Sequence, residues 1–182
     1  MTRPFFLAAY HDPDLTMLGA RDLCILGAAI IFMGEYFANI MNLAIKISLL
    51  SSGLFLLAGM LIGIVKHQRM LKSIDHTAPA YIDIAHRAAF LYSFAMLVIA
   101  KLLEYSPYSE AVQLGAMGLV LVFLSITIVG YFSHGMINKT DNLFRERTFA
   151  TTTYTYMLTV GEIVGLSVII WGFVSTQILG WN

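Results

Sequence analysis

Long apolar stretches separated by short polar segments make up most of the sequence. A helix that crosses a membrane needs roughly 20 mostly apolar residues, because each residue adds about 1.5 Å. Five stretches meet this rule, approximately residues 22–46, 47–65, 82–103, 111–134 and 154–178. One uninterrupted helix over residues 22–65 would be about 65 Å long, so we expect a tight hairpin between the first two. The pattern predicts an all-α, polytopic bundle of five transmembrane helices, preceded by a cytoplasmic or interfacial tail over residues 1–21.

The composition agrees with this prediction and excludes several classes of protein. Hydrophobic residues make up 58% of the chain and charged residues only 12%, and the mean hydropathy is +0.76. The formal net charge is zero, so nucleic acid is not an expected partner. Cys24 is the single cysteine, which excludes an intramolecular disulfide and a cysteine-based metal cage within one chain.

The basic residues indicate which end of the bundle faces the cytoplasm. With five crossings, one face of the membrane receives nine of the eleven lysines and arginines: Arg3, Arg21, Lys66, Arg69, Lys72, Arg87, Lys139, Arg145 and Arg147. The other face keeps Lys46 and Lys101. Because cytoplasmic loops carry the excess of basic residues, we expect the amino terminus inside and the carboxyl terminus outside. A bacterial inner membrane is the expected location.

Polar residues within the apolar stretches are the first candidates for function, since a charge in lipid is costly without a partner. Four of them share one face of the first predicted helix, spaced i, i+4, i+7 and i+11: Glu35, Asn39, Asn42 and Lys46. They would form either interhelical hydrogen bonds or a hydrated path or partner interface. A second acid, Glu162, is flanked by Gly161 and Gly165 in the last stretch, and this spacing of small residues favours close helix packing.

A second group of polar residues lies in the predicted cytoplasmic half. His86 and His134 fall near the inner ends of adjacent helices, and the neighbouring members of the group are Asp83, Arg87, Tyr131 and Glu162. Imidazoles at this depth suit a haem iron or another metal. Asp83 would then orient the His86 imidazole, and Arg87 would reach a propionate. The alternative is that each histidine forms interfacial hydrogen bonds only.

Three short motifs point to a known family. They are residues 53–59, which open one helix, Ala85 and His86, which open the next, and Val129, Gly130 and Tyr131 late in the one after. From about Ser52 onward the chain in these features resembles the small membrane proteins of the styrene oxide isomerase and hydroxylaminobenzene mutase group. The resemblance implies haem b with His86 on a ferric iron that acts as a Lewis acid on an epoxide, and Tyr131 as the phenol that positions the substrate.

Three functions are therefore carried forward from the sequence. The first is a binding or accessory subunit of a membrane assembly, in contact with other membrane subunits or with further copies of itself, holding a haem or metal in its cytoplasmic half. The second is a haem-dependent membrane isomerase that takes a small apolar substrate from the lipid bilayer. The third is a small transporter that uses Glu35 and Glu162 as proton or ion sites.

Overall fold

The structure, a computed structural model, describes residues 42–142, 145 and 150–181. These residues form four α-helices: α2 (Leu43–Lys72), α3 (Ala80–Leu103), α4 (Glu110–Ile137) and α5 (Thr155–Gln177), the last preceded by a π-helical turn, η3 (Ala150–Tyr154). Each of the four spans is long and apolar enough to cross a membrane, and the described ranges contain no strand. The predicted all-α membrane bundle is thus confirmed for this part of the chain. The predicted tail and the first span up to residue 41 lie outside the described residues.

The structure corrects the predicted boundary between the first two helices. The sequence predicts this boundary at residues 46 and 47, but α2 already begins at Leu43, because Asn42 has an extended backbone and its side chain accepts a hydrogen bond from the Ile45 amide. A helix from residue 22 therefore does not continue to Lys46, and Asn42 and Lys46 do not share one helical face. At its other end α2 runs to Lys72 instead of residue 65. Charge marks the edge of an apolar stretch, whereas a helix continues until its backbone conformation changes.

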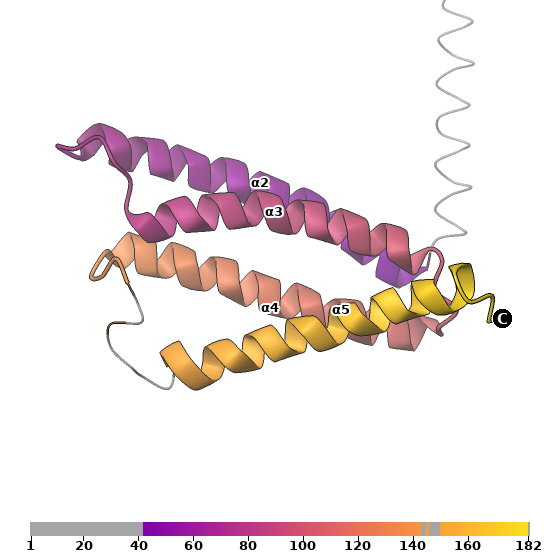
Figure 1. Cartoon of the computed structure of the whole chain (residues 1–182). Coiled ribbons are helices and arrows are strands. Elements are labelled where there is room, and N and C mark those ends of the chain that lie inside the picture. Colours follow the sequence, from indigo (N-terminus) through magenta and orange to yellow (C-terminus); the bar gives the residue numbers. More distant parts are fainter. Residues whose placement is uncertain (1–41, 143–144, 146–149, 182) are drawn as a thin grey trace, which may run out of the picture. The chain divides into compact units, whose positions relative to one another are not determined.

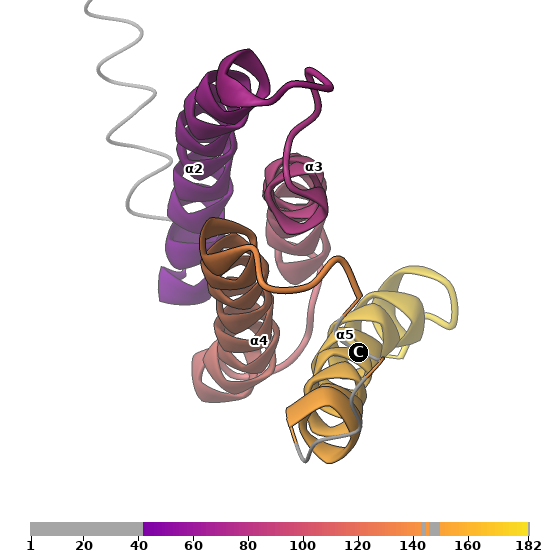
Figure 2. The same cartoon turned by 90° about the vertical axis from the view of Figure 1, so that its left-hand side faces the viewer.

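Helices α2 and α3 lie side by side along their length, as both views in Figures 1 and 2 show. Small side chains let the two backbones approach each other. Ser48 Oγ donates a hydrogen bond of 2.8 Å to the Met96 carbonyl, and Ser52 Oγ donates one of 2.8 Å to the Ser93 carbonyl. In a membrane, where apolar surface gains nothing from leaving lipid for protein, such short-range packing and hydrogen bonds hold helices together.

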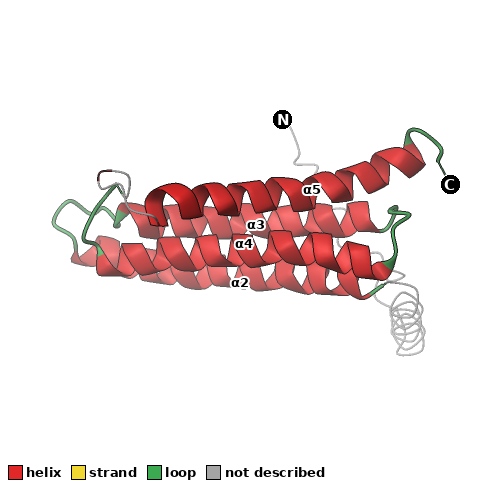
Figure 3. Cartoon of the chain, turned by 90° about the horizontal axis from the view of Figure 1, so that it is seen from below, coloured by secondary structure: helices red, strands yellow, loops and turns green. Residues whose placement is uncertain are grey.

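Close packing of α4 against α5 depends on two glycines of α5. A Cβ atom on Gly165 would lie 2.7 Å from the Ala116 carbonyl oxygen, and one on Gly161 would collide with the Phe123 ring. This is the close approach that the glycines beside Glu162 predict. Figure 3 shows α5 running along the other helices, with its C-terminal end turning away from them.

Polar contacts close one end of the bundle, and Gln113 is their centre. Its side chain is only 4% exposed. Asn42 Nδ2 donates to Gln113 Oε1 at 2.6 Å, and Gln113 Nε2 donates to the Tyr108 carbonyl at 2.9 Å. Beside it, Glu110 Oε1 accepts from the Leu43 amide at 2.7 Å. The start of α2 is therefore tied to the start of α4, and the orphan amides of the first turn of α2 find acceptors.

Candidate functional site

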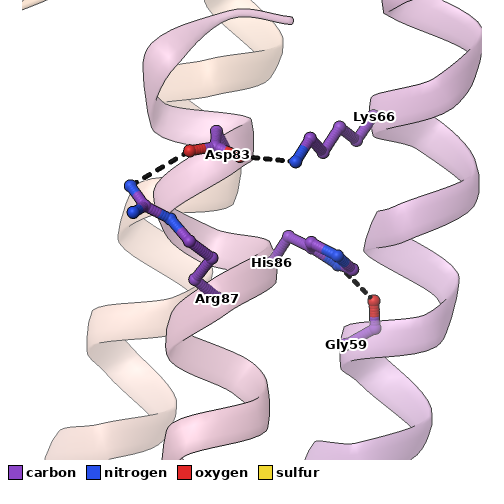
Figure 4. A network of polar contacts seen from close by, with 5 residues as sticks. All are labelled: Gly59, Lys66, Asp83, His86 and Arg87. Atoms are coloured by element: carbon purple, nitrogen blue, oxygen red, sulfur yellow. Dashed lines mark hydrogen bonds and ion pairs between the residues drawn. The ribbon is translucent and has the colours of Figure 1, made fainter.

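A network of polar side chains joins α2 to α3 near their connected ends (Figure 4). The Asp83 carboxylate lies between two cations, with Oδ1 2.6 Å from Lys66 Nζ and Oδ2 3.0 Å from an Arg87 guanidinium nitrogen. One turn further along α3, His86 Nδ1 lies 2.9 Å from the Gly59 carbonyl oxygen. Lys66 and Gly59 are on α2, so both contacts cross the same helix pair. The network combines one carboxylate with two cations and a backbone-bound imidazole.

The His86 ring is packed into the interface between α2 and α3. A Cβ atom on Gly63 would lie 2.8 Å from His86 Cε1, so only a glycine leaves room for the ring at this position of α2. The Phe90 ring meets the imidazole edge-on, at 5.0 Å between ring centroids. A carbonyl oxygen only accepts hydrogen bonds, so Nδ1 carries the proton and donates to Gly59. In the neutral ring, this leaves Nε2 as the nitrogen with a free lone pair.

A separate aromatic group joins α3 to α4. The Tyr81 ring stacks on Tyr131 at 6.1 Å between centroids and lies at a tilt to His134 at the same distance. The backbones are close here, because a Cβ atom on Gly135 would lie 2.5 Å from the Ile82 nitrogen. Tyr131 and His134 therefore share a neighbour, Tyr81, that the sequence did not single out.

The structure divides the polar pocket that we expected in this half of the bundle. His86 contacts α2, whereas His134 and Tyr131 contact Tyr81 at the interface of α3 with α4. Asp83 binds Lys66 and Arg87. The Gly59 carbonyl, instead of Asp83, binds the His86 imidazole.

The His86 ring lies between α2 and α3, whereas the predicted haem lies between α3 and α4. The partner of His86 Nδ1 is the Gly59 carbonyl instead of Asp83, whose carboxylate holds Lys66 and Arg87. Within the described ranges, no three or more His, Cys, Asp or Glu side chains gather as metal ligands. Haem binding itself stays a prediction. The test is a Soret band in protein purified with haem available, compared with His86→Ala.

Glu162 belongs to a polar stripe on α5. Thr155, Thr159 and Glu162 are spaced i, i+4 and i+7, so they lie on one side of the helix. Glu162 is half-buried, and none of the described residues donates a hydrogen bond or ion pair to its carboxylate. Thr176 lies 14 residues after Glu162, so it is on the same side of α5 as the stripe.

This side of α5 is open toward its beginning and closed toward its end. Near the end, Thr176 Oγ1 donates to the Tyr105 carbonyl at 2.8 Å, and the Phe173 ring meets Tyr105 edge-on at 5.9 Å. Toward the beginning, Thr155 and Thr159 are exposed. A carboxyl group thus lies in an apolar span beside a helix surface that the described bundle leaves uncovered.

Sequence reasoning missed three residues that the structure brings into polar or aromatic contacts. Gln113 and Glu110 bind the start of α2, and the Tyr92 ring meets Phe55 edge-on at 6.3 Å between ring centroids. A glutamine within an apolar run is itself a signal, since buried amides need partners. Glu35 and Asn39 lie outside the described residues.

Comparison of the chain with known protein families, with curated proteins and with solved structures finds no match.

Proposed function

We propose that this chain is an accessory subunit of a membrane assembly, and that the stripe of Thr155, Thr159 and Glu162 receives a transmembrane helix of another subunit. The observation that carries the proposal is the half-buried Glu162 carboxyl, which has no hydrogen-bond donor among the described residues. A five-helix chain with its amino terminus in the cytoplasm, in a bacterial inner membrane, is part of the same proposal.

The position of Glu162 within the apolar span favours a partner. It lies seven residues into α5, roughly 10 Å along the helix from its first residue. A charged side chain deep in hydrocarbon costs about 2.5 to 3.5 kcal/mol on the insertion scale. A helix that brings an amide, a hydroxyl or a cation to this depth removes that cost.

The exposure of α5 supports the same partner. Only 17% of its apolar window is buried, against 28% for α2 and α4 and 39% for α3. A lipid-covered helix needs no polar side chain on its outer surface, whereas an interface between membrane helices is enriched in threonine and small residues. The transporter alternative also uses Glu162, but it requires a second site on the same path, and Glu35 lies outside the described residues.

Site-directed photocrosslinking in the native membrane tests the proposal. A photoreactive residue at Leu166, one turn beyond Glu162 on the same side of α5, is expected to give one discrete adduct with another membrane protein. The matched control is Val164, which is exposed but lies on another side of the helix. We expect the Leu166 adduct to disappear in Glu162→Leu and to persist in part in Glu162→Gln, which keeps a hydrogen-bonding group.

Three outcomes would overturn the proposal. They are an adduct of equal yield from both positions, a yield that Glu162→Leu leaves unchanged, and an adduct with twice the mass of this chain. The last result would identify a second copy as the occupant of the stripe.

A further inference from the structure

Three basic side chains at the end of the bundle that holds the α2–α3 loop are without a carboxylate. Arg69, Lys72 and Lys139 form no ion pair with any described residue. Arg69 reaches from α2 toward α4, where its guanidinium lies 3.7 Å from Met136 Sδ. Lys139 follows directly after Asn138, the C-cap residue of α4. Cations from α2 and from the segment after α4 therefore lie at this end of the bundle.

The same helix pair carries an open apolar groove of ≈ 480 Å³ deeper in the bundle. Its lining residues are Ser51, Leu54, Phe55, Leu121, Val122, Ser125 and Ile126. The two serines do not make it polar, because Ser51 Oγ donates to the Ile47 carbonyl and Ser125 Oγ to the Leu121 carbonyl within their own helices. The groove offers an apolar surface only.

The spacing between these two features matches one leaflet of a bilayer. Ile126 and Met136 are ten residues apart on α4, which corresponds to roughly 15 Å along the helix. The hydrocarbon core of a bilayer is about 30 Å thick, so one leaflet contributes about 15 Å. An acyl chain whose headgroup lies beside Arg69 would reach the groove near the middle of the membrane.

We propose that the surface between α2 and α4 is a binding site for an anionic phospholipid, with its phosphate at Arg69 and Lys139 and one acyl chain along the groove. A free phosphate would use the cations but not the groove, and a transmembrane helix would use the groove without requiring the cations. A phospholipid has both parts. At the opposite end of the bundle, Lys101 is paired with Glu104 at 2.6 Å, so that end lacks the same excess of free cations around it.

The site is tested by native mass spectrometry of the purified full-length chain in detergent, titrated with phosphatidylglycerol and with phosphatidylcholine. We expect the wild type to prefer phosphatidylglycerol. Each basic residue near a membrane surface contributes about 1 kcal/mol toward anionic lipid, so the double variant Arg69→Gln, Lys139→Gln is expected to bind phosphatidylglycerol about 30-fold more weakly. Ser125→Leu, which fills the groove and keeps the charges, is expected to weaken the binding of both lipids.

The control is the double variant Lys46→Gln, Lys101→Gln, which removes the same charge from the other end and is expected to bind like the wild type. Thermal unfolding without added lipid verifies that each variant is folded. If the double variant at Arg69 and Lys139 does not fold, Lys139→Gln alone serves, since that side chain is exposed. An unchanged preference for phosphatidylglycerol, an equal loss in the control, or full competition by inorganic phosphate at the lipid's own concentration would overturn the site.

Discussion

His86 Nδ1 and the carbonyl oxygen of Gly59 are 2.9 Å apart across the interface of α2 with α3. The contact is possible because Gly63, one turn beyond Gly59, has no side chain and leaves room for the imidazole. A side chain on one helix thus satisfies a backbone group on the next. In an apolar environment an unpaired imidazole nitrogen is costly, so the contact also fixes how far His86 extends along α2.

Gly63→Ala is the direct test of this relationship. The new methyl group would lie 2.8 Å from His86 Cε1, so the ring must shift and its hydrogen bond to Gly59 weakens. We expect a loss of about 1 to 3 kcal/mol in the free energy of unfolding, the usual effect of overpacking. Gly53→Ala on the same helix is the control, because nothing lies within 4 Å of its added Cβ atom. Thermal unfolding in detergent that ranks the two variants alike would contradict the packing.

The two ion pairs of Asp83 are expected to differ in strength. Lys66 is the closer partner, at 2.6 Å with a side chain 28% exposed, whereas Arg87 is 3.0 Å away and 66% exposed. Water screens the more exposed pair, so we expect a coupling energy near 1 kcal/mol for Lys66 and roughly 0.3 kcal/mol for Arg87. Double-mutant cycles of Asp83→Asn with Lys66→Met and with Arg87→Gln measure both. A larger coupling for Arg87 would refute the ranking.

Gln113→Leu is expected to loosen the closed end of the bundle. The substitution removes the acceptor of the Asn42 amide and the donor to the Tyr108 carbonyl, and buried groups left without partners cost about 1 to 3 kcal/mol. Gln68→Leu on α2 provides the control, since that glutamine is exposed. Hydrogen exchange should then increase for the first turn of α2 in the first variant only. If the exchange of that turn stays slow, Gln113 does not hold it.

The existence of the four described helices was predictable, because apolar runs of this length have one stable form in a membrane. The start of α2 carries a local signal in the sequence, since Asn42 is a typical N-cap residue before an apolar run. The partners of the polar residues were not predictable in the same way. The carbonyl that binds His86 belongs to a glycine 27 residues earlier, and only the register of α2 against α3 brings the two together.

The sidedness of the bundle is the prediction with the widest consequence. Asn42 binds Gln113 near the Tyr108 carbonyl, and Thr176 binds the Tyr105 carbonyl, so the start of α2 and the end of α5 lie at the same end of the bundle. That end holds few basic residues, and the positive-inside rule assigns it to the outside.

A reporter enzyme fused after Asn182 should therefore report an extracytoplasmic position, and one inserted at Asp75, in the loop between α2 and α3, a cytoplasmic position. Each fusion is a control for the other. Four described helices separate residue 42 from residue 182, so these two positions are expected on the same side of the membrane. One helix separates residue 42 from residue 75, so residue 75 is expected on the opposite side. Two reporters on the same side would refute the helix count. A cytoplasmic reporter after Asn182 with an extracytoplasmic one at Asp75 would agree with the four spans but refute the orientation. The basic end with Arg69 and Lys139 would then face outward.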